Sequence, residues 1–567
     1  MKYFLLDYSL DKTKLIRTIS VYDSTDKNIR VFNSKLEENT ITKFIEYYCS
    51  CDQLPNVISF WDNSESKLEF LENVIRKYLD GELKTTFKLV IQPEQTLIDY
   101  STLYEDKFCL DNKHFSYYLN DIVEDFIILS KLTEEIKVKD DIEKFVAIDN
   151  VVSCVNRLVK LCEYCDAPLS NFVSTSKLVE CLYRKNGGKF DYSVKESEDL
   201  LVGGYSFAQI GCYNNVLALD FRSFYPSIIK TFNISNETID CSGIKTQNNL
   251  YFSNEKIGII PKIVTKLLEA RLNCNEEDEL NYKILVNAFY GCFAYKNSPI
   301  YSKDLASAIT TTAQDIIKAV IQFINKYIEK KYDLANSVVF AFTDSLFIHK
   351  NGKDINDNEI IEMINKFVSF YVKKKFNCDT CYIIIDKKYT AKTCFILDKL
   401  NHIDIDENDQ FVIAGTDIRR AEYSLIQRNY MMEFVKHYVD SNYNFEETKK
   451  YIEDSFVKFS KNKSCNTFSV RRKLTTNNKV MKDGVDLHNK LITYFSDSKL
   501  YDIIDENDEK LKFTFVKNSK NCLCYKDILF EHFKMYLDID KMKCWDEFVV
   551  KPTMSVITKI RDLHVTE

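Results

Sequence analysis

Two aspartates that interrupt apolar stretches of this 567-residue chain could hold metal ions. The apolar residues 216–219 before Asp220 are typical of a strand buried on both faces. Asp344 lies midway along residues 338–348, whose two apolar arms predict a hairpin with a carboxylate at its tip. A buried carboxylate is costly unless a backbone donor, a cation or a metal ion compensates it. Two aspartates at adjacent strand ends would form a minimal protein ligand set for Mg²⁺, which otherwise relies on water and substrate phosphates.

Each aspartate also has a simpler structural interpretation. Asp220 could cap a helix that follows the strand. Pro226 would end the strand, because proline has no N–H group to donate to a neighbouring strand. Asp344 could belong to an ordinary turn, where aspartate is common. These alternatives stay open unless other stretches supply matching chemistry.

A third stretch supplies cations for an anionic ligand. At about 100° per residue, Lys283, Asn287 and Tyr290 fall within roughly 60° of one another on a helix, and Gly291 allows close backbone approach. Arg271 lies on a predicted preceding helix, and an acidic turn between the two would fold them antiparallel. The two cations would then face one ligand, for which a triphosphate with Mg²⁺ is the natural candidate. A solvated polar face is the alternative.

The predicted secondary structure supplies the elements that must position these residues. Strands come first and helices follow, which favours an α/β or α+β domain ending near residue 165 within an α/β multidomain chain. Strands are predicted at residues 3–7, 16–22, 28–31, 56–60, 382–385, 394–397 and 411–415, the first two as a hairpin. Helices are predicted at residues 67–78, 117–132, 151–164, 176–184, 261–273, 278–290 (ended by Gly291) and 305–332, and through most of the chain beyond 424.

The composition is that of a globular protein with several domains. Hydrophobic residues make up 45% and charged residues 28%, with no repeat or low-complexity tract. The net charge of −7 gives no indication of a nucleic-acid binder, but local clusters of Lys and Arg decide that question. The pairs Cys162/Cys165 and Cys378/Cys381 have zinc-ligand spacing, yet buried or half-buried free thiols are the favoured interpretation because the pairs lie far apart in sequence.

Ordered motifs between about residues 200 and 425 resemble those of B-family DNA polymerases. Residues 220–229 resemble the family's motif A (D-x-x-S-L-Y-P-S-I-I), and residues 283–291 its motif B (K-x-x-x-N-S-x-Y-G), with Ala288 where Ser is usual. Residues 340–345 resemble motif C (Y-G-D-T-D-S). The resemblance implies a right-hand polymerase with palm, fingers and thumb. Such an enzyme extends a primer 3′-hydroxyl with dNTPs by a two-metal mechanism that uses two Mg²⁺ ions, with Mn²⁺ as a substitute.

The resemblance also implies a role for each matching residue. Asp220 and Asp344 would be catalytic and would ligate the metals, together with the Phe221 carbonyl and a nearby acid, Asp386. Tyr225 would be the steric gate that rejects a ribose 2′-hydroxyl. The nucleotide-binding residues would be Ser223, Phe224, Tyr225, Arg271, Lys283, Asn287 and Tyr290. The DNA-binding residues would be Gly291, Thr343, Arg419 and Arg420.

Two departures from the family pattern bear on activity. Phe342 stands where motif C usually has its first acid, so the metal site has one carboxylate fewer nearby. The family's lysine-tyrosine motif is at best degraded around residues 399–402. Because the main ligand of motif C is the second acid, here Asp344, activity is still expected.

Residues 1–165 match the order of elements of the family's ribonuclease-H-like 3′–5′ exonuclease. Of its four metal carboxylates, only Asp7 and Asp149 remain. The best alignment of the middle motif places Asp62, Ser66 and Lys67 at its Asn, Phe and Asp. Two-metal hydrolysis should then fail, which predicts a retained fold without proofreading. The alternative is that the middle motif is misaligned.

The resulting domain prediction assigns the whole chain. The exonuclease-like domain spans 1–165, connecting helices and a loop 166–215, the palm with motif A 216–260, short fingers 261–292, the palm with motif C 293–423, and the thumb 424–567. Residues 458–482 are dense in Lys and Arg, including Arg471 and Arg472, which indicates either a DNA-backbone-gripping surface or a solvated charged face.

Partners and location follow from the same observations. Primer–template DNA, dNTPs and a processivity factor or other replication proteins are the implied partners. No apolar run could span a bilayer, and the first ends at Asp7, too early for a signal peptide, so an intracellular protein without a membrane partner is expected. Small size and eroded motifs favour a viral or mobile-element source, and hence the host cytoplasm or nucleus. Two other classes remain open: a catalytically silent DNA-binding or structural subunit, and a template-independent transferase or primase-like enzyme.

Overall fold

The chain divides into two compact units, and the computed structural model describes most of both. Unit 1 comprises Met1–Phe108, Ile136–Ala208 and Asn215–Thr390, and unit 2 comprises Cys109–Glu135, Gln209–Asn214 and Ala391–Glu567. The described residues are 2–11, 13–51, 55, 57–60, 64–79, 88–89, 96–99, 104–110, 113–118, 146, 154–168, 175–190, 202–416, 418, 420, 423–461, 465–472, 511–515, 522–525 and 539–564.

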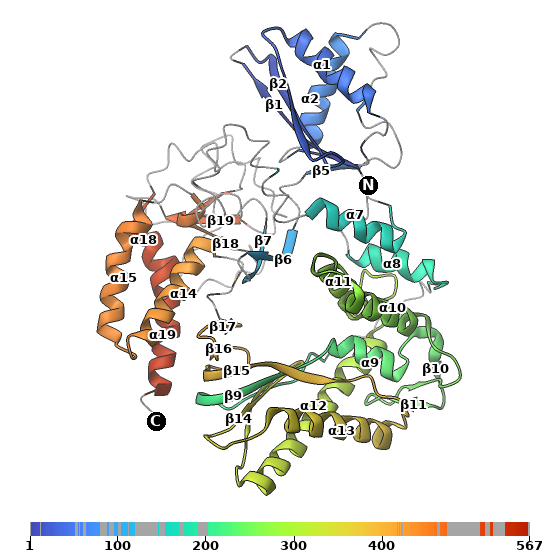
Figure 1. Cartoon of the computed structure of the whole chain (residues 1–567), viewed down its shortest axis with the longest axis vertical. Coiled ribbons are helices and arrows are strands. Elements are labelled where there is room, and N and C mark those ends of the chain that lie inside the picture. Colours follow the sequence, from blue (N-terminus) through green and yellow to red (C-terminus); the bar gives the residue numbers. More distant parts are fainter. Residues whose placement is uncertain are drawn as a thin grey trace. The chain divides into compact units, whose positions relative to one another are not determined.

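The N-terminal part of unit 1 is a five-stranded sheet with two helices packed beside it (Figure 1). Its strand order is β3-β2-β1-β4-β5, with β1 antiparallel to β2 and parallel to β4, so the predicted hairpin is confirmed. Phe4 and Phe44 lie in the core shared by sheet and helices, although the sequence prediction had omitted α1. The elements are β1 (Tyr3–Leu10), β2 (Ile16–Asp23), β3 (Asn28–Asn33), α1 (Glu37–Ser50), β4 (Val57–Phe60), α2 (Ser64–Lys77) and β5 (Thr96–Asp99).

A second sheet in unit 1 carries Asp220 near the end of one strand, and Asp344 lies in a turn between two of its other strands. Its strands run in the order β15-β9-β14-β13-β8, and β9 pairs antiparallel with β14. Helices α12 and α13 lie side by side against this sheet (Figure 1), because residues such as Ile309, Ile316 and Val320 form a buried stripe at helical spacing. The elements are β8 (Ser206–Ala208), β9 (Gly211–Phe221), α9 (Phe224–Phe232), α12 (Lys303–Tyr332), β13 (Val338–Phe342), β14 (Ser345–His349), α13 (Asp357–Phe376) and β15 (Ile385–Ile396).

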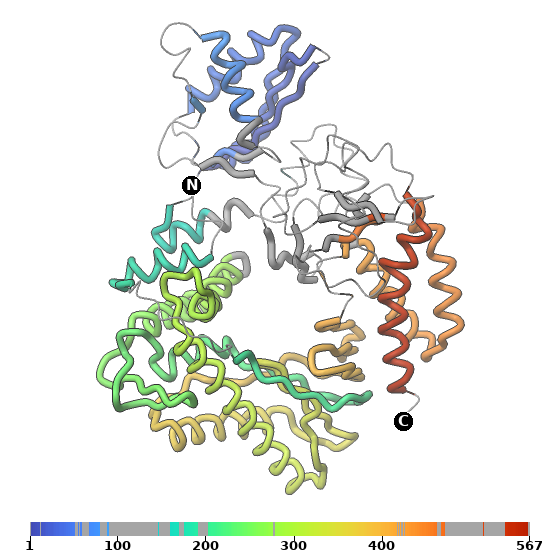
Figure 2. The backbone as a smooth tube through the Cα atoms, turned by 180° about the vertical axis from the view of Figure 1, so that it is seen from behind, coloured from blue at the N-terminus to red at the C-terminus, as the bar shows by residue number. Residues whose placement is uncertain are grey.

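Two helices, α10 and α11, pack against each other in the green part of the tube in Figure 2. Helix α11 is tied to α7 by the ion pair between Lys160 and Asp278 (2.8 Å) and by edge-on packing of Tyr164 on Tyr282 (5.3 Å between ring centroids). The elements are α7 (Cys154–Cys165), α8 (Thr175–Lys185), a 3-10 turn η3 (Asn236–Thr238), β10 (Ile239–Asp240), β11 (Ile244–Lys245), β12 (Tyr251–Phe252), α10 (Ile259–Asn273) and α11 (Glu276–Ala294).

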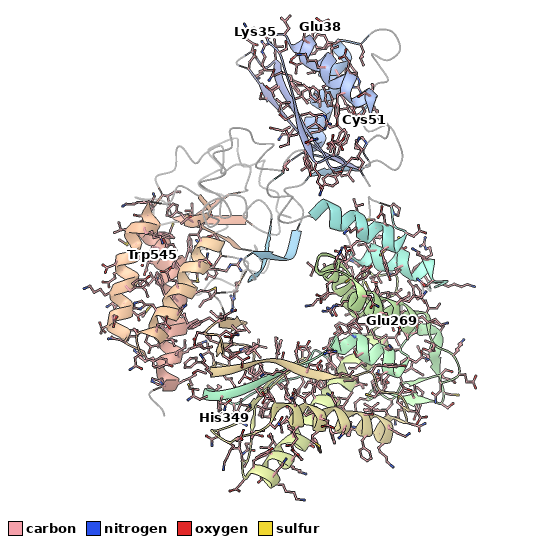
Figure 3. The ribbon with its side chains drawn as sticks, in the orientation of Figure 1. Lys35, Glu38, Cys51, Glu269, His349 and Trp545 are labelled. Carbon is pink, nitrogen blue, oxygen red and sulfur yellow. The ribbon has the colours of Figure 1, made fainter. Side chains whose placement is uncertain are left out.

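Unit 2 combines an antiparallel strand group with a helical bundle. Trp545 is almost fully buried between the helices, with its ring 4.6 Å from that of Phe459 and 5.4 Å from that of Tyr430 (Figure 3). Its strand orders are β17-β16-β15 and β18-β19-β20. The elements are β16 (His402–Asp406), β17 (Phe411–Ala414), α14 (Leu425–Asp440), α15 (Phe445–Ser460), η5 (Cys465–Phe468), β18 (Ser469–Arg472), β19 (Leu511–Phe515), β20 (Cys522–Tyr525), α18 (Lys541–Trp545), a π-helical turn η7 (Asp546–Val550) and α19 (Lys551–His564). A separate two-stranded sheet consists of β6 (Tyr104–Leu110) and β7 (Lys113–Tyr118).

Three predictions of secondary structure are wrong in part. Gly291 does not end α11, which continues to Ala294 because the buried Cys292 and Phe293 hold its last turn. The helix predicted from residue 117 starts within β7, and the rest of it lies outside the described residues. Residues 382–384 precede β15, which begins at Ile385 and runs without a break to Ile396.

The two cysteine pairs are free thiols, of which Cys162, Cys165 and Cys378 are buried and Cys381 is half-buried. Burial raises the pKa of Cys162 to about 11 and that of Cys165 to about 12, and it also raises the pKa of Cys378 to about 11. Within the described ranges, no three His, Cys, Asp or Glu side chains are grouped so that they could hold a metal ion. In the same part of the chain, no helix combines the length and apolarity needed to cross a membrane.

Candidate active site

The two aspartates meet where β9 ends and β14 begins. Asp220 lies directly opposite Ser345 in the antiparallel register, and the Ser345 hydroxyl donates to Asp220 Oδ1 at 2.8 Å. One residue further on, the Phe221 amide donates to the Asp344 carbonyl oxygen at 2.9 Å. This register places both carboxyl groups at one strand end, as the sequence predicted from two separate apolar stretches.

A tight turn between β13 and β14 presents Asp344. Thr343 has a left-handed backbone (φ 54°), and its amide donates to the Tyr205 carbonyl oxygen at 2.8 Å. A Cβ added at Gly204 would lie 2.6 Å from Thr343 Oγ1, so only glycine fits beside the turn. The Phe342 side chain is 41% exposed at this tip. Phe342 therefore supplies a ring where a further metal-binding acid would stand.

The carboxylate pair favours a cation. Burial, and next the charge of Asp220, raise the pKa of Asp344 to about 6, while the charges of Lys388 and Lys283 oppose this shift. Two acids held together this way repel each other unless a positive charge lies between them. One or two carboxylates with water and phosphate oxygens are the usual ligands of Mg²⁺ in phosphoryl-transfer sites, so the donor set fits this ion.

The start of α9 forms a second wall of the site. Ser223, the residue before the helix, has φ 43°, and its carbonyl oxygen accepts from the Ser227 amide at 2.8 Å. The Phe224 ring stacks on that of Phe221 at 4.4 Å. Tyr225 packs against Tyr290 of α11 with 4.5 Å between ring centroids. Burial raises the pKa of the Tyr225 hydroxyl, so this hydroxyl stays neutral. A rigid aromatic pair thus stands close to the carboxylates.

Helices α10 and α11 supply the cationic wall. The Arg271 guanidinium donates to Glu279 through Nε (3.1 Å) and Nη2 (2.8 Å), and to the Ser223 hydroxyl through Nη1 (3.0 Å). These side chains line a cavity of about 1050 Å³. The predicted site residues that line it are Asp220, Phe221, Ser223, Phe224, Tyr225, Arg271, Lys283, Asn287, Tyr290, Thr343, Asp344 and Asp386.

The cavity also contains charged residues that the sequence prediction missed. Arg222, Lys230, Lys387 and Lys388 line it, and Arg222 forms an ion pair with Asp386. The predicted metal-near acid is therefore already partnered by a guanidinium. Asp386, Lys387 and Lys388 are consecutive charges beside a predicted strand, which was a usable signal. Their placement beside β9 depends on sheet order, which local sequence does not reveal.

The remaining predicted residues lie elsewhere or cannot be placed. Gly291 lines a smaller cavity of about 450 Å³ between α8 and α11. Asp7 is partly exposed on β1, and Arg420 is exposed in unit 2. Arg471 and Arg472 lie on β18, where only the backbone is described. The predictions for Asp149 and Arg419 fall outside the described residues, as does Asp62 of the middle exonuclease motif.

Comparison with known proteins extends these observations. The family model described as DNA polymerase family B matches residues 207–535. The chain is 30% identical over 244 residues to the DNA polymerase alpha catalytic subunit of Arabidopsis thaliana, which is 38% of this chain and 15% of that protein. It is 29% identical over 249 residues to a DNA polymerase of Thermococcus gorgonarius, covering 40% of this chain and 30% of that protein.

The fold has a solved counterpart. A family B DNA polymerase structure from Pyrobaculum calidifontis superposes with a TM-score of 0.57 at 16% identity, over 98% of this chain and 77% of the other. The matched stretches thus span less than a third of the two curated relatives, whereas the fold likeness extends over nearly the whole chain.

Proposed function

Because this chain belongs to DNA polymerase family B, we propose that it extends a primer 3′-hydroxyl with dNTPs on a DNA template. The main support for this proposal is that Asp220 and Asp344 lie next to each other at one strand end. They open into the same cavity as Arg271 and Lys283. Carboxylates for metal ions and cations for a triphosphate are the two requirements of nucleotidyl transfer.

The residues of the cavity divide the work of this reaction. Asp220, Asp344 and the Phe221 carbonyl would hold divalent metal ions, which when bound acidify the primer hydroxyl and neutralise charge on the triphosphate. Arg271 and Lys283 orient the triphosphate, so that the primer oxygen bonds to the α-phosphorus and pyrophosphate leaves. Tyr225, backed by Tyr290, fills the space that a ribose 2′-hydroxyl would need. Asn287 borders the position of the new base pair.

The other regions receive roles that follow from the same proposal. Residues 1–165 would be an exonuclease-type scaffold without proofreading, because Ser9 stands where its second acid is expected. Residues 216–260 and 293–423 would form the palm, 261–292 the fingers and 424–567 the thumb, joined by 166–215. Arg419, Arg420, Arg471 and Arg472 would hold DNA phosphates, which position the duplex without reading its sequence. The two-helix fingers and eroded motifs support a compact, viral or mobile-element type of polymerase.

Primer extension tests the proposal directly. The protein is incubated with a 5′-labelled primer on a longer template, dNTPs and Mg²⁺, with parallel reactions that lack template or contain a chelator. Extension to the template end, abolished by chelator and by omission of template, is expected. Extension without template would instead indicate a transferase, and DNA binding without any extension would indicate a silent structural subunit.

A further inference from the structure

The Arg271 guanidinium is occupied by protein groups before any nucleotide is present. Two of its nitrogens donate to one oxygen of Glu279 and a third donates to Ser223. The Arg271 side chain is 24% exposed, whereas that of Glu279 is 49% exposed. Arg271 is thus held from both sides, by the start of α9 and by the acid on α11.

Glu279 and a triphosphate compete for the same donors. Both Arg271 and Glu279 line the large cavity, and a guanidinium binds phosphate best through two parallel N–H groups. The edge formed by Nε and Nη2 is the one that Glu279 occupies. Because Glu279 is half exposed, water screens its ion pair and its side chain can turn into solvent.

We propose that Glu279 is a displaceable counter-ion that keeps Arg271 directed at the cavity and yields to the triphosphate of an incoming nucleotide. Glu279 is a positioning residue in this scheme, because it acts through Arg271. The exchange lowers the affinity of ligands that reach the Arg271 guanidinium, so its effect should be larger for nucleoside triphosphates than for monophosphates. This inference rests on the proposed function, since it assigns a role within the same site.

Steady-state extension kinetics with Glu279→Gln test the exchange. Removing the competing charge should lower KM for dNTP about 2- to 5-fold, the range of an exposed ion pair, with kcat unchanged. Glu269→Gln is the matched control, because Glu269 lies on α10, is exposed and is not among the residues that line the cavity (Figure 3). The control should leave both constants as they are.

A double-mutant cycle separates the action through Arg271 from simple repulsion. In an Arg271→Ala background, Glu279→Gln should have no further effect on KM. An equal decrease of KM in that background would overturn the proposal, because Glu279 would then act on the nucleotide directly. An unchanged or raised KM in the single variant would overturn it as well.

Equilibrium binding keeps this inference distinct from the proposed function. Binding of dATP and dAMP with Mg²⁺ is measured by equilibrium dialysis without primer or template. Glu279→Gln should bind dATP 2- to 5-fold more tightly and dAMP with a smaller change. If the protein binds in this way but does not extend primers, only the proposed function fails. If it extends primers and the variant binds dATP like the unmodified chain, only the counter-ion role fails.

Discussion

Asp220 and Asp344 depend on each other through a few hydrogen bonds at one strand end. Ser345, 125 positions after Asp220, donates to its carboxylate, and the backbone of Asp344 accepts from Phe221. Burial, and next the charge of Asp220, raise the pKa of Asp344, so a nearby positive charge would stabilise its ionised form. A bound cation would offset the repulsion between the two carboxylates.

Asp344→Asn tests the metal-binding role at this scale. Asparagine keeps the size of the side chain but removes its charge, so primer extension should fall by at least about 100-fold. The rate is measured by single-turnover extension over a range of Mg²⁺ concentrations. Asp333→Asn is the control, since Asp333 is an exposed left-handed cap after α12 where asparagine is equally suited. Extension at the unmodified rate in Asp344→Asn would sink the assignment.

Tyr225 is the residue expected to choose the sugar. Its ring packs against that of Tyr290, so replacing it with valine removes the ring that would exclude a ribose 2′-hydroxyl. For Tyr225→Val, the ratio of kcat/KM for dNTP to that for the matching rNTP should fall about 10- to 100-fold. Tyr225→Phe keeps the ring and should keep the selectivity. Unaltered selectivity in the valine variant would count against the gate role.

At the scale of elements, α11 combines a functional and a structural demand. Its face toward the large cavity carries Glu279, Lys283 and Tyr290, while its N-terminal part is fastened to α7 by Asp278. Gly291 lies inside this helix, and no atom of the described residues lies within 4 Å of an added Cβ. A glycine there weakens the helix without any packing reason, which suggests that the open space serves a ligand.

Gly291→Ala should therefore stabilise the protein and slow the enzyme. Alanine favours a helix interior by about 0.8–1 kcal/mol over glycine, so the free energy of unfolding should rise by up to that amount. If DNA approaches the backbone at Gly291, the added methyl group should weaken primer–template binding. Chemical denaturation and DNA-binding titrations measure the two effects, with Ala288→Gly as the reverse change on the same helix. Greater stability with unchanged DNA affinity would refute the close approach.

At the scale of the whole molecule, the N-terminal sheet raises the question of why a domain with few catalytic acids is retained. Its core is formed around Phe4, Ile41 and Phe44, and β1 also carries the partly exposed Asp7. The packing of this sheet and its helices thus depends on apolar side chains rather than on Asp7. A scaffold role needs only the packed sheet and helices.

The absence of proofreading is testable with 3′-labelled DNA and Mg²⁺ in the absence of dNTPs. We expect no release of labelled nucleotide above that in a chelator control, because two of the four expected carboxylates are missing from the sequence. Asp7→Asn should behave like the unmodified chain. Release that disappears in Asp7→Asn would show instead that the middle motif was misaligned and that the domain is active.

The sequence alone determined the residue types and most elements of the site. Asp220 and Asp344 stood out because a charge inside an apolar stretch is costly, and α10, α11 and α12 followed from helical periodicity and caps. Helix ends were less certain: α11 runs past Gly291, since buried neighbours outweigh local propensity.

Only the tertiary structure decided which groups meet. The pairing of Asp220 with Ser345 depends on strand register, and the place of Lys388 depends on β15 lying next to β9. The contact of Arg271 with Glu279 depends on how two helices pack. Such relations are long-range, because they arise from the burial of whole faces rather than from neighbours in sequence. For that reason the sequence could indicate which acidic and basic side chains belong to the site, but it could not indicate that Glu279 pairs with Arg271.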